Sequence, residues 1–525
     1  MNHLTIAPVL LPLLAGIVLL LMRHVDLRVR RVLSVAAMVM EIGLAIALLA
    51  TVADGDILVY ALGDWPAPYG IVLVADRLSA WLLLTTALLA LFALLHALRG
   101  IDASGRHFHV LFQLQLFGLA GAFLTGDLFN LFVFFEILLL ASYGLMLHGG
   151  GRLRTRAGLH YVVLNLAGST LFLFAVGTLY GVLGTLNMAD LARQVAATPA
   201  ENVAVVRAAG LLLFGVFALK AALLPLHLWL PAAYAQASAP VAALFAIMTK
   251  VGAYSILRVD TLIFGAGAGA LANLYSAWLL PMALATLAIG TLGAMASRHL
   301  RAQIAYLVVA SAGSLLTAFG LAGAEGIAAG LYYLPHTTFA AAAAFLIADA
   351  IAGRRGELAD RLDPGPTLPS NRVLGGLFFV VAVAVVGLPP LSGFLGKFLL
   401  LRAALDHPWL PAVMATVLGA GLLTLIALAR SGSLLFYRTQ SAGRVPAVSP
   451  RALAVELTPV AGLLLLVGSL TVAAGPAAEY AQATASQLLQ PYQYIHAVLG
   501  EQVSQGRPKT LADPPGGRAQ GDRGQ

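Results

Sequence analysis

Residues 207–231 read RAAGLLLFGVFALKAALLPLHLWLP, an apolar run that contains Lys220 and, five residues later, Pro225. A helix needs about 20 apolar residues to cross the hydrocarbon core of a bilayer. Runs of this kind recur along the 525-residue chain, which is 60% hydrophobic and 10% charged, with a mean hydropathy of +0.90. A soluble protein of this length carries far more charge on its surface. The chain is therefore predicted to be integral to a membrane.

Apolar runs between charged or Gly/Pro-rich breaks predict fourteen spans of an all-α polytopic fold. Helices are expected because lipid cannot satisfy an open backbone, whereas barrel strands are alternating segments of about ten residues. The first run lacks a basic segment before it and is long enough to span, so it is assigned as a helix and not as a signal peptide. The predicted spans are 4–22, 32–52, 75–97, 108–125, 128–148, 158–183, 207–231, 237–258, 272–296, 302–322, 326–349, 373–400, 408–429 and 452–474.

Arginine is unevenly distributed among the connections between these spans. Connections after odd-numbered spans hold nineteen arginines and those after even-numbered spans hold five, among them Arg258, while the second connection is acidic and includes Asp76. Short cytoplasmic loops are rich in Lys and Arg, so both termini are predicted to face outward. The net charge of +8 is attributed to these loops and not to nucleic-acid binding. The chain has no cysteine, which excludes disulfides and thiolate metal sites.

Ionisable residues inside the predicted spans are the candidates for function. Lys220, Lys250 and Lys397 lie in spans, whereas every cation assigned to a connection is Arg. A desolvated lysine can lose its proton, but an arginine cannot. Glu136 lies in the middle of the fifth span, where its charge costs about 2.5 kcal/mol or more to insert. The alternative is a structural ion pair between Glu136 and a lysine.

Two of these lysines lie beside predicted helix breaks. Pro225 follows Lys220, and the run GLPPLSGFLGK places Pro389 and Pro390 before Lys397. Proline removes a backbone donor, and the freed backbone is tolerated at membrane depth only where it lines protein or water. Paired broken segments in two halves of a transporter indicate inverted repeats around an ion path. The sequence therefore predicts two inverted repeats, each with one broken helix.

Other polar residues are weaker candidates. His336 lies in the eleventh span and His227 in the first break, and each could exchange protons or be a buried neutral histidine bonded to a carbonyl. Glu41 could lie at a subunit interface and Asp349 at the membrane surface, so neither is assigned a role. The sequence has no P-loop, no dinucleotide-binding glycine motif and no HExxH. No cofactor or metal site is predicted.

Two motifs around these lysines support a resemblance to a known family. KAALLPLHLWLPAAY at 220–234, followed by APVAAL and by KVGAY at 250–254, resembles the proton-conducting antiporter-like family. That family includes proton-pumping membrane subunits of complex I and large subunits of Mrp-type (Pha-type) cation/proton antiporters. GLPPLSGFLGK at 387–397 matches its second signature, and the resemblance covers nearly all of residues 1–475. DLFNLFVFFE at 127–136, GGGR at 149–152 and GTLYGVLGTLN at 177–187 are most similar to the D-type subunits of Mrp/Pha antiporters.

The resemblance implies roles for the buried residues. Glu136 and Lys220 would form the first proton-handling pair, Lys250 would link the two halves, and His336 and Lys397 would continue the path. His227 is a possible further member. Relatives often carry a lysine a few residues after the histidine, where this chain has alanines at 340–344. That difference either interrupts the second half of a relay or increases the importance of the histidine.

The chain is divided accordingly into an N-terminal three-helix segment (1–106), two antiporter-like repeats (107–260 and 261–431), a C-terminal transmembrane helix (432–475) and an external segment (476–525). In the last segment, residues 477–500 are predicted to form an interfacial amphipathic helix. Its expected anchors are Tyr480, Leu488, Leu489, Tyr492 and Tyr494. The Gly/Pro/Gln-rich residues beyond Glu501 are predicted to be disordered.

The function predicted from the resemblance is proton translocation within a multisubunit Na⁺/H⁺ or K⁺/H⁺ antiporter of the cell (inner) membrane, with other membrane subunits as partners. The main alternative is a proton-pumping membrane component of a complex I-like or hydrogenase-like oxidoreductase, which would make the chain part of a redox enzyme. A scaffold whose ionisable residues are structural pairs and an independent solute permease are further alternatives.

Overall fold

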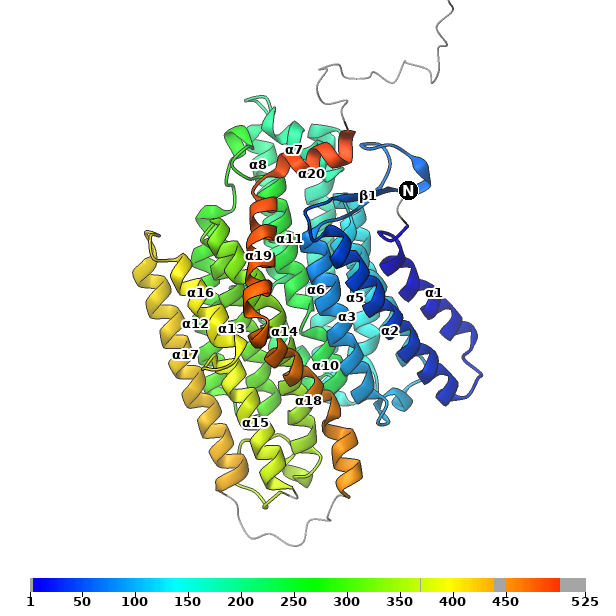
Figure 1. Ribbon diagram of the computed structural model, residues 1–525, viewed down its shortest axis with the longest axis vertical. Coiled ribbons are helices and arrows are strands. Elements are labelled where there is room, and N and C mark those ends of the chain that lie inside the picture. The colour runs from blue at the N-terminus through cyan, green and yellow to red at the C-terminus, as the bar shows by residue number, and fades with distance from the viewer. Residues whose placement is uncertain (1–2, 369, 439–448, 501–525) are drawn as a thin grey trace, which may run out of the picture.

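The structure, a computed structural model, describes residues 3–368, 370–438 and 449–500. It is a bundle of long helices with one small hairpin at one end (Figure 1). The tail predicted to be disordered beyond Glu501, and Arg444 among the loop arginines, lie outside the described residues.

The first part of the chain contains three helices and the hairpin. The strands pair antiparallel, with Leu58 opposite Ala75, in the connection between the second and third helices. The hairpin turn contains a short 3-10 helix, η1, at Leu62–Asp64. The elements are α1 (Ala7–Leu21), α2 (Leu27–Val52), β1 (Leu58–Ala61), β2 (Val72–Ala75) and α3 (Arg77–Ala97).

The two central groups of helices carry the candidate residues. The first group is α4 (Phe108–Leu124), α5 (Leu128–Leu147), α6 (Arg152–Leu183), α7 (Met188–Ala196), α8 (Val203–Lys220), α9 (Trp229–Gln236), α10 (Ala239–Phe245) and α11 (Met248–Leu262). The second is α12 (Ser276–Ala296), α13 (Leu300–Gly320), α14 (Ala324–Ala352), α15 (Asn371–Val386), α16 (Ser392–Ala403) and α17 (Leu410–Gly432), which continues as the π-helical turn η5 (Ser433–Tyr437). The C-terminal part is α18 (Pro450–Val472), α19 (Ala474–Leu488) and α20 (Pro491–Leu499).

Within the described residues, eleven helices are long and apolar enough to cross a membrane. Three shorter apolar helices, Ala7–Leu21, Phe108–Leu124 and Asn371–Val386, coincide with further predicted spans. Each predicted range overlaps one helix or one interrupted pair of helices. The chain is thus a mostly helical, multi-pass membrane protein.

Both predicted helix breaks are present. The chain leaves helical geometry after Lys220 and resumes it at Trp229, and it does so again between Val386 and Ser392. At the first break the Leu224 amide donates to Thr286 Oγ1 at 2.8 Å, and Trp229 Nε1 donates to the Leu219 carbonyl at 2.9 Å. Backbone groups freed by the break are therefore satisfied inside the protein, as they must be at membrane depth.

Glycines allow the tightest helix packing in the second group. A Cβ at Gly290 would lie 2.5 Å from the Ala310 amide nitrogen, and one at Gly313 would lie 2.4 Å from that of Leu287. Small residues of this kind let membrane helices approach closely. They bring α12 and α13 into extensive contact.

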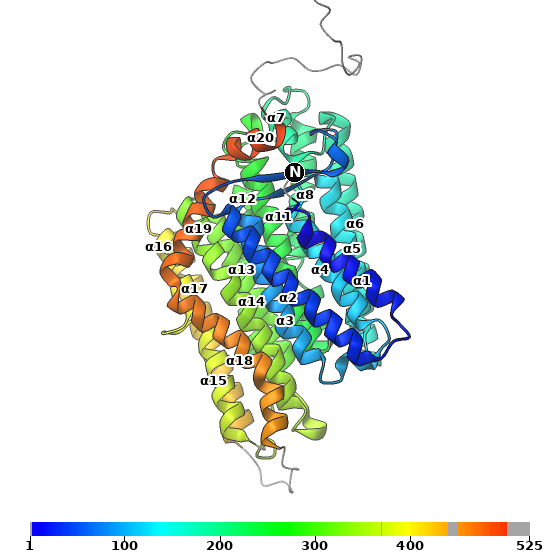
Figure 2. The same ribbon diagram turned by 45° about the vertical axis from the view of Figure 1, so that its right-hand side comes forward.

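The C-terminal segment differs from its prediction as a single interfacial helix. It consists of α19 and α20; α19 packs on α14, and α20 packs on α7 (Figures 1 and 2). Leu489 and Tyr492 are exposed, as expected of anchors, but Leu488 and Tyr494 are buried against protein. Tyr480 is half-buried, and its hydroxyl donates to the Arg77 carbonyl. The prediction is therefore wrong for Leu488 and Tyr494, because an apolar stripe that suits lipid also suits a protein surface.

Both views place α7, α20, the hairpin and the start of the chain at one end of the bundle, opposite the far ends of α15 and α18 (Figure 2). The connections that the charge pattern assigns to the same side of the membrane thus lie together.

Candidate functional site

Lys220 is the last residue of α8 and is 7% exposed. Its Nζ donates to Asn165 Oδ1 at 3.2 Å, and Asn165 Nδ2 donates in turn to the Tyr161 carbonyl at 2.9 Å. A small, mostly apolar cavity adjoins the ammonium group and is lined by residues from α5, α6, α8, α9 and α11, including Phe135 and Trp229. The lysine is thus held by a neutral partner at the meeting point of five helices.

Glu136 lies near the middle of α5. Within the described part of the chain it forms no ion pair, and its Oε1 is buried without a hydrogen-bond partner. It makes no hydrogen bond or ion pair with Lys220 in the described residues. The described residues therefore do not contain the structural ion pair between Glu136 and a lysine that was the alternative.

Lys250 lies in the first turn of α11 and is fully buried. Its Nζ has no hydrogen-bond partner among the residues that the structure describes. Just before it, at Ala246 and Ile247, the backbone hydrogen bonds tighten to the three-residue spacing of a 3-10 turn, while both residues keep right-handed helical dihedrals. The sequence gives no signal of this turn, because neither residue is a proline or a glycine. Lys220 and Lys397 therefore lie beside broken helices, whereas Lys250 lies at a local turn within one continuous apolar helix.

The helix that carries Lys250 lies between the two halves of the bundle. It contacts α8 on one side and α13 on the other, while α10 contacts α14. The contact with α8 is close, because a Cβ at Gly252 would lie 2.4 Å from the Ala221 nitrogen and 2.7 Å from the Lys220 carbonyl carbon. The backbones next to Lys220 and Lys250 therefore touch.

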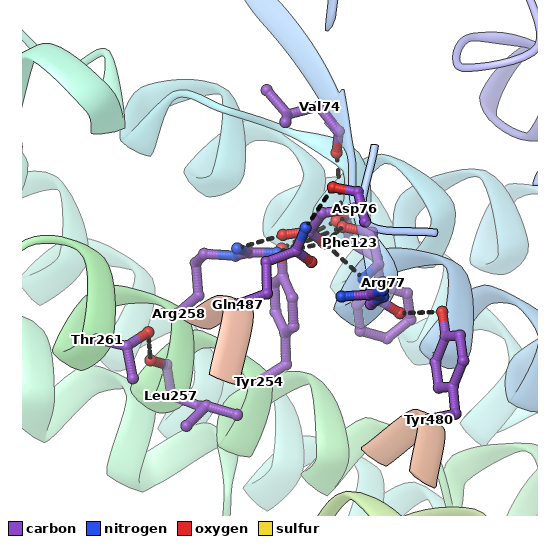
Figure 3. A network of polar contacts seen from close by, with 12 residues as sticks. Val74, Asp76, Arg77, Phe123, Tyr254, Leu257, Arg258, Thr261, Tyr480 and Gln487 are labelled. Atoms are coloured by element: carbon purple, nitrogen blue, oxygen red, sulfur yellow. Dashed lines mark hydrogen bonds and ion pairs between the residues drawn. The ribbon is translucent and has the colours of Figure 1, made fainter. Parts of the chain in front are cut away.

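The C-terminal end of α11 is fixed by a buried ion pair, shown in Figure 3. Arg258 Nη1 and Nη2 lie 2.6 and 2.8 Å from the two carboxylate oxygens of Asp76, which also accepts from the Ser79 amide and so caps α3. The Tyr254 hydroxyl donates to the Phe123 carbonyl at 2.9 Å. The prediction that Arg258 lies in an external connection is wrong: it is 4% exposed and belongs to α11.

The spacing of residues 250, 254 and 258 places Lys250, Tyr254 and Arg258 on one face of α11. Sequence reasoning missed the pair because Asp76 and Arg258 are 182 residues apart. An arginine four residues from the end of an apolar helix gives no signal of a distant carboxylate. The pair positions α11, and with it Lys250.

His336 and Lys397 line a second cavity, formed mainly by α13, α14 and α17. His336 is 1% exposed; its Nδ1 lies 2.9 Å from Ser392 Oγ, and its Nε2 lies 3.1 Å from the Ala384 carbonyl oxygen. Lys397 Nζ donates to the Val386 carbonyl at 2.6 Å. The two candidate side chains thus satisfy carbonyls near the break that follows α15.

Gly393 is required for this arrangement, because a Cβ there would lie 2.5 Å from His336 Nε2 and 2.6 Å from the Ala384 oxygen. The run of alanines at 340–344 also contributes to this site. Ala340, Ala341 and Ala344 line the same cavity, beside the hydroxyls of Ser311, Ser314, Thr337 and Thr424. Small side chains in this run therefore leave space beside His336 and Lys397 that is walled in part by polar residues.

The remaining polar candidates are separate from these cavities. His227 lies in the first break, is 6% exposed and has no partner for Nδ1 within the described residues. Glu41 is buried on α2, and its Oε2 has no partner in the described part of the chain. Asp349 accepts from Arg301 at 2.5 Å and lies 3.2 Å from His96 Nε2, so it joins the ends of α13, α14 and α3. Asp349 therefore has a structural role that the sequence did not reveal.

Comparison with known proteins gives consistent matches. Residues 125–424 match the family described as NADH:quinone oxidoreductase/Mrp antiporter, transmembrane. The chain is 42% identical to the D subunit of a probable K⁺/H⁺ antiporter of Rhizobium meliloti, over 95% of this chain and 98% of that one. It is 37% identical to the D subunit of a Na⁺/H⁺ antiporter of Bacillus subtilis, over 95% and 100%.

A solved structure extends the likeness to three dimensions. A chain of the Mrp complex from Dietzia sp. superposes with a TM-score of 0.84 at 29% identity, covering 95% of this chain and all of that one. The matched span, 125–424, includes all five candidate residues of the path. The chain belongs to the NADH:quinone oxidoreductase/Mrp antiporter transmembrane family and, within it, is similar to the antiporter D subunits.

Proposed function

We propose that this chain is the proton-translocating component of a multisubunit Na⁺/H⁺ or K⁺/H⁺ antiporter in the cell (inner) membrane, where it works with other membrane subunits. One observation carries the proposal: five ionisable side chains lie within the apolar helices, three of them buried (Lys220, Lys250 and His336), and none of the five forms an ion pair within the described residues. Two of the lysines, Lys220 and Lys397, lie beside broken helices. The names of the relatives, which are D subunits of cation/proton antiporters, support antiport over other uses of the fold.

The proposed topology has fourteen spans with both termini outside. The first repeat, 107–260, contains α4, α5, α6, the α8/α9 pair and the α10/α11 pair; the second, 261–431, contains α12, α13, α14, the α15/α16 pair and α17. The fourth span is interrupted in both. Five spans per repeat start the second on the opposite side of the membrane, which makes the repeats inverted. Residues 1–106 and 432–475 flank them, and the segment from 476 onward is external.

The proposed proton path starts at Glu136 and Lys220, crosses to Lys250 and continues to His336 and Lys397. The contact of α11 with α8 and α13 supports this order. An ionised Glu136 would favour the charged form of Lys220, and a movement that separates the two would pass the proton on. Water in the two cavities would bridge the remaining gaps. Movement of Na⁺ or K⁺ in the opposite direction is coupled through the partner subunits.

The test uses everted vesicles from an antiporter-deficient host that expresses this chain with the full set of neighbouring genes. The pH gradient is followed after addition of Na⁺ or K⁺. Lys220→Ala is expected to lower cation-triggered proton flux about 100-fold or to background, the usual cost of losing a positioned proton-transfer group.

Lys220→Arg is the matched variant, because arginine keeps the positive charge and a donor for Asn165 but cannot release a proton. It is expected to be as inactive as Lys220→Ala, while assembly stays intact. Wild-type flux in Lys220→Arg would contradict the relay and favour a purely structural cation.

The second candidate is a component of a redox-driven pump, because the family description includes NADH:quinone oxidoreductase. Purifying the chain with its partners from the native membrane distinguishes the two candidate functions. Small membrane subunits in the purified complex support antiport. Stoichiometric iron–sulfur proteins, together with no cation-triggered flux, would overturn the antiporter assignment.

A further inference from the structure

A large apolar groove lies between α15 and α17, away from the five candidate residues. It is lined by seventeen residues of α15, α17, the π-helical turn η5 and the break after α15, and η5 closes one side. Phe379 and Leu425 in its wall are exposed, so the groove opens to the outside of the bundle. Its apolar lining includes Phe379, Ala382, Val383, Leu425, Leu428 and Phe436.

The charge of the groove is confined to one end. Arg372 is the one charged residue of its lining and lies beside Asn371, whose Oδ1 is buried without a partner among the described residues. Arg438 follows the lining residue Tyr437 at the same end. Both arginines are exposed, and neither forms an ion pair within the described residues. This end therefore offers two uncompensated positive charges, on the side that the arginine pattern assigns to the cytoplasm.

The length of the groove matches one membrane leaflet. At 1.5 Å per helical residue, α15 rises about 21 Å between Arg372 and Val386, which both line the groove. A single leaflet with its headgroups is about 20–22 Å thick. The inner end lies at the helix break, where the Val386 carbonyl accepts the hydrogen bond from Lys397. An occupant of the groove would therefore cover the bilayer-facing side of that break.

We propose that the groove binds one anionic phospholipid, with its phosphate on Arg372 and Arg438 and its acyl chains along α15 and α17. A zwitterionic phospholipid also carries a phosphate, but the cationic amine of its own headgroup offsets that charge, so it would leave the two arginines with a net positive excess. An apolar helix of a partner subunit would bury them without a counter-charge. An anionic phospholipid satisfies both the apolar wall and the positive rim.

Gly376 provides the position for the test. It lines the groove and is exposed, and a Cβ there would meet no atom within 4 Å, so a photoreactive benzoylphenylalanine can be attached without a backbone clash. The assembled complex is irradiated in native membranes whose phospholipids carry ³²P, and the lipids attached to the chain are identified. The matched control carries the same group at Leu465, an exposed residue of α18 that samples lipid without an adjacent groove.

The adduct at Gly376 is expected to be a phospholipid, with anionic lipids enriched about fivefold or more over the control, the effect of roughly one arginine near a phosphate. Arg372→Gln with Arg438→Gln should reduce the anionic fraction to the control level, whereas Arg372→Lys with Arg438→Lys should preserve it. An adduct with another protein at Gly376, or equal anionic fractions at the two positions, would overturn the proposal. Because the readout is a covalent adduct, its outcome does not depend on antiport activity.

Discussion

Lys220 and Lys250 lie close together where α11 packs on the end of α8. Lys220 is the last residue of α8, and the C-terminal end of a helix carries partial negative charge that favours a cation. Lys250 lies in the first turn of α11. The close contact at Gly252 joins these two segments, so a conformational change at the break after Lys220 would act on both lysines.

Gly252→Ala tests the approach of these two helices. The new methyl would lie 2.4 Å from the Ala221 nitrogen, so α8 and α11 must separate. We expect cation-triggered flux to fall sharply in everted vesicles, and overpacking to cost about 1–3 kcal/mol of stability. Gly215→Ala on α8 is the control, because a Cβ there meets no atom within 4 Å. Equal activity of the two variants would show that the close contact has no role.

Asp102 lies outside the membrane spans and allows a test of how stability depends on pH. It lies in the 3-10 helix η2 (Ile101–Ser104), where Arg31 Nε and Nη2 contact its two oxygens at 2.6 and 2.7 Å and His109 Nε2 lies 3.1 Å away. Burial opposes the charge of the carboxylate, but the hydrogen bonds from Arg31 and His109 outweigh it and lower the pKa of Asp102. The ion pair therefore stabilises the fold fully above the ordinary aspartate pKa of about 3.9, and this contribution is lost as the pH falls through the lower, folded-state value.

Asp102→Asn is accordingly expected to lower thermal stability by a nearly constant amount between pH 7 and about pH 4, with the difference from wild type shrinking at lower pH. The loss should be about 1–3 kcal/mol, because Arg31 and His109 lose a charged partner. Melting of the purified protein in detergent measures it. A difference that grows on acidification would contradict the assigned sign.

The candidate residues that the sequence could identify are charged residues or prolines within otherwise apolar segments. A lysine or glutamate in a 20-residue apolar run, or a proline beside it, is visible without a structure, so Glu136, Lys220 and Lys397 could be chosen. The local turn before Lys250 could not be predicted, because Ala246 and Ile247 are ordinary helix residues. Their assignment to a proton path stays a prediction until flux is measured.

At the scale of elements, the Asp76–Arg258 pair connects α3 to α11. Arg258→Met alone is expected to cost about 3–5 kcal/mol, because it leaves a buried carboxylate unpaired. Adding Asp76→Asn should recover much of that loss, since asparagine is neutral and can still cap α3. Thermal melting of both single variants and the double variant gives the coupling energy. Additive losses would show that the two side chains act independently.

The helices themselves were predictable because each needs about 20 apolar residues whatever its neighbours are. The contacts between helices were not predictable, and this is clearest at the C-terminal end. Tyr480 and Tyr494 fit an interfacial pattern in the sequence, yet Tyr480 donates to Arg77 and Tyr494 lies over Arg258. Amphipathic periodicity reports that a face is apolar, but it does not report whether lipid or protein covers that face.

At the scale of the whole molecule, the natural absence of cysteine makes the proposed topology directly testable. Single Ala103→Cys, Ala197→Cys and Tyr492→Cys variants place a thiol at exposed positions. A membrane-impermeant maleimide is expected to label residues 197 and 492 in intact cells, and residue 103 only in everted vesicles. Labelling of residue 103 in intact cells would reverse the orientation, and labelling of 197 and 492 from opposite sides would refute the span count.

The contacts that close the outer end of the bundle join distant parts of the chain. Tyr480 donates to the Arg77 carbonyl across 403 residues, and Gln487 donates to the Gly55 carbonyl across 432. At about 5–20 residues per second, a ribosome needs roughly 20–80 s to add 400 residues. During biogenesis the segment around the hairpin therefore lacks these contacts until the last helices have been translated. A premature stop codon after α18 would leave every predicted span inserted but this end of the protein open, a defect visible to membrane quality-control proteases and not to the insertion machinery.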